Sequence, residues 1–339
     1  MIFVLVNAAL PLLLAAATWS GTIVTANEQA HSISIIDILS HRVRTIHVDV
    51  APHNVQTSAD RRYLYATGMK EMDMEHMDMT HMSAAQMKEM MESTGVLLGF
   101  DLLHPDAAPF SIPIGRHPAH VIVDSANRYA YVTVAGEDAV KVVDLRRRGI
   151  VAVIPAGKMP HGLRMSPDER TMYVADMDGG TVQFIDVAQR RVIASVPAGK
   201  TPVQVAVAPD GKTVYATLAG DNAVAVIDVA SRTRSKVIQV GPNPMQLYVS
   251  PDGTRVYVAG QGTSAVPGHT VSVIDTASQS VVASVQVPAG AHGVVVTPDG
   301  SKIFVTDAFD SKLSEIDART LSVQSISVGA GPNGVTLGP

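Results

Sequence analysis

A short motif recurs along this chain at a nearly constant interval. Each copy is an apolar pair followed by aspartate, and steps of 42 residues separate Asp144, Asp186 and Asp228. A repeat of about 40 residues is typical of β-propellers and solenoids, whose units bury their apolar faces only against neighbouring units. The chain is therefore expected to fold as a repetitive architecture. The aspartates of the series are Asp37, Asp101, Asp144, Asp186, Asp228, Asp275 and Asp317.

A second feature of the repeat is a Pro-Asp turn upstream of four of the motifs, as in Ala208-Pro-Asp-Gly211 and Ser250-Pro-Asp-Gly253. Proline presets φ and glycine accepts positive φ, so these residues form tight turns between strands. Alternating apolar runs follow, such as 204–208, 213–217, 223–227 and 235–240. Four short strands in a unit of about 42 residues indicate one blade of a β-propeller.

The segment between turn and aspartate carries a further signature, found as Tyr131-Val-Thr-Val134, Tyr173-Val-Ala-Asp176, Tyr257-Val-Ala-Gly260 and Phe304-Val-Thr-Asp307. With these motifs, residues 20–339 resemble the YVTN family of seven-bladed β-propellers. The resemblance implies an all-β fold with four-stranded antiparallel blades. Seven aspartates agree with seven blades.

The two ends of the repeat region each hold part of a blade. Residues 331–337 match a blade start, whereas residues 22–50 supply only the later strands. We therefore expect the N- and C-terminal strands to pair, which removes the open sheet edge and gives one domain over residues 18–339.

Composition and the N-terminus limit the compartment and the partners. The chain has no cysteine, which excludes disulfides and thiolate metal sites, and its net charge of −5 argues against nucleic acid as a partner. Residues 2–17 form an apolar run that predicts a signal peptide over residues 1–17, with a buried first strand as the alternative. We expect a periplasmic or otherwise exported monomer with no membrane span in the mature protein.

One blade is longer than the others, because Asp37 and Asp101 are 64 residues apart. The excess follows the strand at 63–67 and gives an insert at 69–92, which holds nine of the 15 methionines. Thioether and imidazole ligands together suit Cu(I). Packing of a methionine face onto the propeller is the alternative. Such stretches resemble those of bacterial periplasmic copper-resistance proteins. The predicted ligands are Met72, Met74, His76, Met77, Met79, His81 and Met82.

A second candidate site lies where the inner strands begin, on the same face as the insert. Histidines follow the blade-opening position in several blades, and methionines lie beside it in two. We expect these side chains to converge on the channel axis as metal ligands, or else only to cap strands. The candidates are His53, His120, His161, His292, Met159 and Met245.

These patterns favour a copper(I)-binding propeller for metal sequestration, transfer or resistance, acting as a metallochaperone with a copper donor or acceptor protein. The alternatives are an enzyme with a channel metal site and a metal-free interaction scaffold. No nucleophile–base pair, phosphate loop or carboxylate pair stands out in the sequence, so no catalytic residue is assigned.

Overall fold

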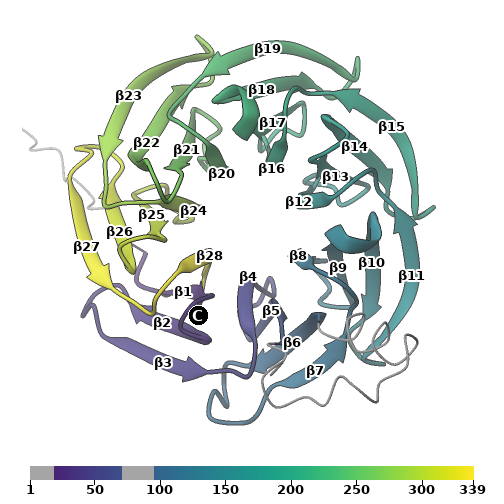
Figure 1. Ribbon diagram of the computed structural model, residues 1–339, viewed down its shortest axis with the longest axis vertical. Coiled ribbons are helices and arrows are strands. Elements are labelled where there is room, and N and C mark those ends of the chain that lie inside the picture. Colours follow the sequence, from purple (N-terminus) through teal and green to yellow (C-terminus); the bar gives the residue numbers. More distant parts are fainter. Residues whose placement is uncertain (1–18, 71–94) are drawn as a thin grey trace, which may run out of the picture.

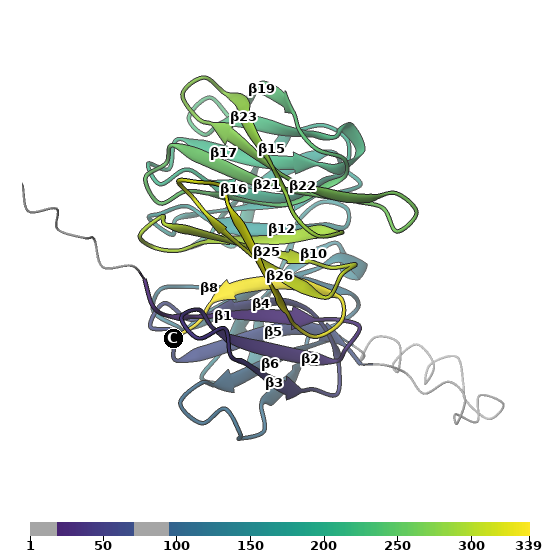
Figure 2. The same ribbon diagram turned by 90° about the vertical axis from the view of Figure 1, so that its left-hand side faces the viewer.

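Seven four-stranded antiparallel sheets surround a central channel in the computed structural model, which describes residues 19–70 and 95–339 (Figure 1). The edge-on view shows the same sheets stacked around the ring (Figure 2). The predicted all-β, seven-bladed propeller is therefore confirmed. The predicted signal peptide at 1–17 and nearly all of the insert lie outside the described residues. Within the described ranges, no helix is both long and apolar enough to cross a membrane.

The strands of each blade follow one another in sequence from the channel outward, except in the blade that closes the ring. The bounds, from inner to outer strand, are β28 (Pro332–Leu337), β1 (Thr22–Asn27), β2 (Ser32–Asp37) and β3 (Val43–His47); β4 (Ala51–Thr57), β5 (Tyr63–Met69), β6 (Gly95–Asp101) and β7 (Phe110–Pro113); β8 (Pro118–Val123), β9 (Tyr129–Val134), β10 (Ala139–Asp144) and β11 (Gly149–Pro155); β12 (Pro160–Met165), β13 (Thr171–Asp176), β14 (Thr181–Asp186) and β15 (Arg191–Pro197); β16 (Pro202–Val207), β17 (Thr213–Leu218), β18 (Ala223–Asp228) and β19 (Thr233–Gln239); β20 (Pro244–Val249), β21 (Arg255–Gly262), β22 (Pro267–Asp275) and β23 (Ser280–Gln286); β24 (Ala291–Val296), β25 (Lys302–Asp307), β26 (Lys312–Asp317) and β27 (Val323–Ser327). Two short 3₁₀ turns cover Ala135–Glu137 and Ala219–Asp221.

The ring closes through β1 and β28, which lie side by side although they come from opposite ends of the chain (Figure 1). Their antiparallel register pairs Ile23 with Leu337 and Thr25 with Val335. The Thr22 amide also donates to the Pro339 carbonyl at 2.9 Å. The predicted pairing of the terminal strands is confirmed.

The repeated residues have separate structural roles. The aromatic residue of the signature is buried between blades, and the Tyr173 ring packs edge-on against Phe184 with 4.8 Å between centroids. The aspartate at the end of each third strand caps the next turn, as when Asp228 Oδ1 accepts the Ser231 amide at 2.7 Å. These hydrogen bonds lower the pKa of Asp228. The repeated residues therefore serve core packing and turn capping.

Every inner strand contains a β-bulge close to its first residue. In β12 the register shifts between Pro160 and Leu163, and the same shift occurs in the other six inner strands. A bulge places two residues opposite one and turns their side chains away from the regular alternation. In this fold it redirects the residues that follow the blade-opening proline.

Candidate metal site at the channel mouth

Three histidines come together where three consecutive inner strands begin. His53 lies on β4, His120 on β8 and His161 on β12, and each falls within the bulge of its strand. One nitrogen from each ring lies within 4.8 Å of the nitrogens from the other two. The ring centroids are 4.7 Å apart for His120 and His161, 5.5 Å for His53 and His161, and 5.8 Å for His53 and His120.

The threonine of the signature connects two of these blades. The His120 amide donates to Thr133 Oγ1 at 2.9 Å, and that hydroxyl donates to the His161 carbonyl at 2.6 Å. Thr217 makes the equivalent link between Gln204 and Met245. One hydroxyl thus satisfies a bulge amide and fixes the spacing between neighbouring inner strands, so the imidazoles are carried on a rigid frame.

Backbone and side-chain groups around the histidines orient the rings. His161 Nδ1 lies 3.1 Å from the Val203 carbonyl, which accepts its proton and leaves the Nε2 lone pair free. His53 Nδ1 lies 3.5 Å from Glu28 Oε1, and the Asn333 amide donates to the other oxygen of that carboxylate. A carboxylate or carbonyl behind a histidine is the usual arrangement around metal ligands.

His120 is held by a different partner. Gln204 Oε1 accepts the Val205 amide at 2.9 Å, so the Gln204 amide nitrogen faces His120 Nδ1 at 3.2 Å. The second ring nitrogen, Nε2, is buried and has no hydrogen-bond partner in the described part of the chain. Buried polar atoms normally find a partner, so this nitrogen is the unsatisfied atom of the cluster.

Burial and repulsion between the rings lower the pKa of two of these imidazoles, those of His120 and His161. Desolvation, followed by the charge of His53, lowers the pKa of His161 to about 3. Desolvation, His161 and His53 lower the pKa of His120 well below its usual value. At Glu28, burial raises the pKa, but the hydrogen bond and charge of His53 outweigh it, and the net shift is downward. His120 and His161 are therefore uncharged at neutral pH, and the carboxylate of Glu28 lies beside His53.

The other predicted channel residues lie farther from this cluster or outside it. His292 is buried on β24, where its Nδ1 lies 3.2 Å from the Asn333 carbonyl, and it is not part of the three-histidine group. Desolvation and then the charge of His53 lower its pKa to about 4. Met245 occupies the equivalent bulge position on β20. Met159 precedes β12 and is 40% exposed.

The predicted ligands Met72 to Met82 lie outside the described residues, but the attachment of their segment is clear. The second and third strands of the blade, β5 and β6, pair up to Met69 and Gly95. Met69 also pairs with Ala51 at the start of β4, two residues before His53. The segment therefore leaves the propeller from the same end of the blade as the histidine cluster.

Sequence reasoning missed two residues of this site, Glu28 and Gln204. Glu28 lies after β1 and reaches His53 across the boundary between its blade and the next one. Gln204 is the second residue after Pro202, as His120 is after Pro118. Comparing blades at that second position would have found Gln204, whereas Glu28 leaves no such periodic signal.

The fold and the channel mouth define a closed seven-bladed propeller with a histidine cluster at one end. The sequence model of the YNCE-like β-propeller family matches residues 66–255 and 217–338. The chain belongs to this family.

Solved structures show the same fold at low sequence identity. Hydrazine synthase from Kuenenia stuttgartiensis is 20% identical, with a TM-score of 0.69 over 85% of this chain and 90% of that one. A functionally unknown protein from Desulfotomaculum acetoxidans is 14% identical, with a TM-score of 0.74 over 94% and 99%. The dihydro-heme d1 dehydrogenase NirN is 14% identical, with a TM-score of 0.64 over 93% and 75%. No curated protein sequence matches the chain.

Proposed function

We propose that this propeller binds copper(I) at the channel mouth through His53, His120 and His161, and that it serves metal sequestration, transfer or resistance in the periplasm. The observation that carries the proposal is the convergence of three imidazole nitrogens within 4.8 Å of one another. The unpartnered Nε2 of buried His120 adds to it, since a bound cation would satisfy that atom.

The nitrogens of the cluster, within 4.8 Å of one another, are spaced more widely than the ligands of a bound metal ion. With metal–nitrogen bonds of about 2.0 Å, ligand nitrogens in a tetrahedral site lie about 3.3 Å apart. The three rings would therefore have to approach one another by rotations about their own side-chain bonds. For His120, the proton must move from Nε2 to Nδ1. Turning the Gln204 amide over would let Oε1 accept that proton, in exchange for its present hydrogen bond from the Val205 amide.

The choice of copper rests on two ligand sets. Imidazoles suit zinc, copper, iron and nickel, whereas thioethers select Cu(I). The predicted ligands of the insert are Met72, Met74, Met77, Met79, Met82, His76 and His81, and copper is the metal that suits both sets. The insert would capture the ion, and the cluster beside its attachment point would hold it more firmly because rigid neighbouring strands carry its three rings.

The test is anaerobic titration of Cu(I) against a chromophoric chelator, with zinc as the competing metal. Four proteins are compared: wild type, His53→Ala/His120→Ala/His161→Ala, a deletion of residues 71–94, and the control His41→Ala/His47→Ala/His104→Ala. The control removes three exposed or half-exposed histidines on outer parts of the blades. We expect the first triple variant to lose the tighter site and the deletion to lose the remaining ions.

A triple cluster variant with the full metal count and affinity of wild type would show that these histidines only cap strands. If the wild-type protein binds zinc more tightly than Cu(I), the proposal that the site binds copper is wrong.

A further inference from the structure

The opposite end of the channel carries a second ring of side chains, four residues after each blade-opening position. The ring begins with Arg164, and steps of 42 residues lead to Ala206 and Tyr248. The remaining members are Gln56, Ile122, Val295 and Thr336. Six of the seven line a cavity of about 430 Å³ whose wall includes the turns of the other face.

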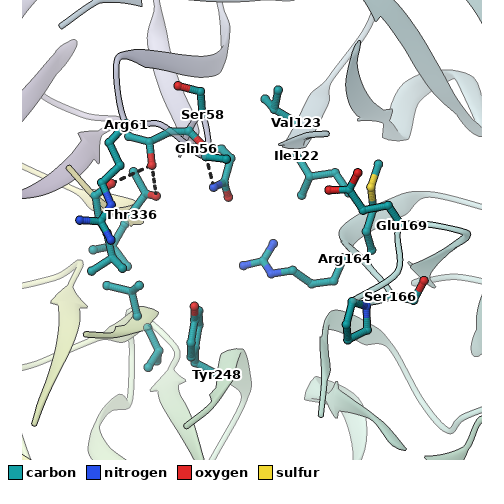
Figure 3. Close-up of a pocket in the computed structure, with 18 residues that line it drawn as sticks. Gln56, Ser58, Arg61, Ile122, Val123, Arg164, Ser166, Glu169, Tyr248 and Thr336 are labelled. Carbon is teal, nitrogen blue, oxygen red and sulfur yellow. Dashed lines mark hydrogen bonds between the residues drawn. The ribbon is translucent and has the colours of Figure 1, made fainter. Parts of the chain in front are cut away.

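Arg164 dominates the chemistry of this cavity. Its guanidinium extends into the open space, with the Tyr248 hydroxyl directed toward it (Figure 3). Its hydrogen bond goes to the Leu163 carbonyl at 2.9 Å, and it forms no ion pair within residues 19–70 and 95–339. Desolvation lowers the pKa of Arg164. A desolvated cation without a counter-charge lowers the stability of the folded state, so Arg164 in this position is unfavourable for folding.

The other charged groups of the lining are already engaged. Both carboxylate oxygens of Glu169 accept hydrogen bonds from Ser125, at 2.8 Å from its amide and 3.0 Å from its hydroxyl. The Arg61 guanidinium lies over the Trp19 ring, 5.4 Å from its centroid. Arg164 is therefore the one cation of the described lining that is directed at the channel axis without an acidic partner.

The shape and polarity of the cavity narrow the class of anion. A planar guanidinium can donate two parallel hydrogen bonds to a carboxylate. A single such cation, with a carboxylate also in the lining, suits a monoanion better than a dianion such as phosphate. Ile122, Val295 and Val335 supply an apolar wall for the rest of the ligand.

We propose that this cavity binds a small organic monocarboxylate, with its carboxylate on Arg164 and Tyr248 and its apolar body against the valine and isoleucine side chains. The site lies at the end of the inner strands, away from the histidine cluster at their start. It does not rest on metal binding, so its test uses metal-free protein.

Benzoate is the probe, benzamide is the uncharged counterpart of the same shape, and inorganic phosphate is the competing anion class. Binding is measured by calorimetry or by ligand-observed NMR on wild type, Arg164→Gln, Arg164→Lys and Tyr248→Phe. Arg170→Gln is the matched control, because Arg170 follows the same strand but its side chain is 87% exposed. Thermal melting checks that each variant folds.

We expect benzoate to bind wild type and Arg170→Gln equally, and Arg164→Gln roughly 10- to 100-fold more weakly, as for loss of a hydrogen bond to a charged group. Arg164→Lys keeps the charge without the fork and should bind more weakly than wild type. The proposal is overturned if benzoate does not bind wild type, if benzamide binds as tightly, or if phosphate binds more tightly than benzoate. If Arg164→Lys binds benzoate as tightly as wild type, the guanidinium does not hold the carboxylate through two hydrogen bonds. This comparison remains decisive if Arg164→Gln does not fold.

Discussion

The residues in the bulge of each inner strand decide the chemistry of the channel mouth. The bulge at the start of the inner strand directs one or two side chains toward the axis, whatever their identity. Four blades place histidine there, three of them neighbours, and two others place Val203 and Met245. Because the frame is the same in every blade, function can change by substitution at these positions without loss of the core.

At this scale we predict that Glu28→Gln weakens metal binding at the cluster by roughly 10- to 100-fold, the usual effect of removing a partner behind a ligand. The carboxylate lies 3.5 Å from His53 Nδ1, and a neutral amide would orient and polarise that ring less. The measurement is chelator competition on the protein lacking residues 71–94, so that only the cluster is observed. Glu169→Gln at the other end of the channel is the control, and equal losses in both variants would contradict the assignment.

The sequence was enough to select the histidines as candidate ligands, but it did not show how they are arranged. The prolines fixed where each inner strand begins, so convergence of His53 and His161 followed from the repeat. His120 lies one residue later than the others, and only the two-residue bulge explains why it still reaches them. Glu28 could not be foreseen, because its contact with His53 crosses the boundary between two blades.

Two blades have an aspartate at the end of the second strand, Asp176 in one and Asp307 in the other, and the two differ in their hydrogen bonds. Asp176 accepts four hydrogen bonds, from the Lys158 and Gly179 amides, Thr181 Oγ1 and Gln183 Nε2, at 2.6 to 3.1 Å. Asp307 accepts one, from Ser314 Oγ at 2.8 Å, and its Oδ1 is buried without a partner among the described residues. The same strand end is thus satisfied in one blade and unsatisfied in another.

Asp307 should therefore make stability depend on pH. Desolvation raises its pKa to about 8, aided by Asp310 and opposed by Ser314 and Lys312. The folded state holds this proton while the unfolded state, with a usual aspartate pKa of about 4, releases it. Its stabilising contribution is complete below pH of about 4 and is lost as the pH rises toward about 8, by up to about 1.4 kcal/mol per pH unit.

The check is urea unfolding of wild type and Asp307→Asn at several pH values from 5 to 8. We expect the asparagine variant to gain stability relative to wild type as the pH rises, because it imitates the protonated acid. Asp176→Asn is the contrasting control and should lose about 1–3 kcal/mol, since its amide cannot accept all four donors. A constant difference between wild type and Asp307→Asn over this range would rule out a raised pKa.

For the molecule as a whole, closure through β1 and β28 gives the last blade its fourth strand. We predict that removing residues 328–339 severely reduces stability, because β1 loses its inner partner strand and Val335 leaves the core shared with Ile23 and Phe304. Thermal and urea unfolding of full-length and truncated proteins is the measurement. A truncated protein that melts with the full-length one would exclude this role for β28.

The architecture was predictable because the same strand pattern recurs in the sequence of every blade. The spacing of Asp144, Asp186 and Asp228 gave the blade length, and the surplus between Asp37 and Asp101 located the insert between the second and third strands of its blade, now seen as β5 and β6. Arg164 escaped notice because it occurs in one blade only. A repeat shows what the blades share, whereas sites are formed by what they do not share.

The closing blade also has a consequence for the order of folding. Ile23 and Leu337 are paired although more than 300 residues separate them along the chain. Contacts of such long range are formed slowly, since the whole intervening chain must be arranged before the two strands can meet. During refolding, β1 keeps an open edge until that step, and open edges invite pairing with other molecules. The yield of refolded protein should therefore fall as its concentration rises, because intermolecular pairing competes with the last strand of the ring.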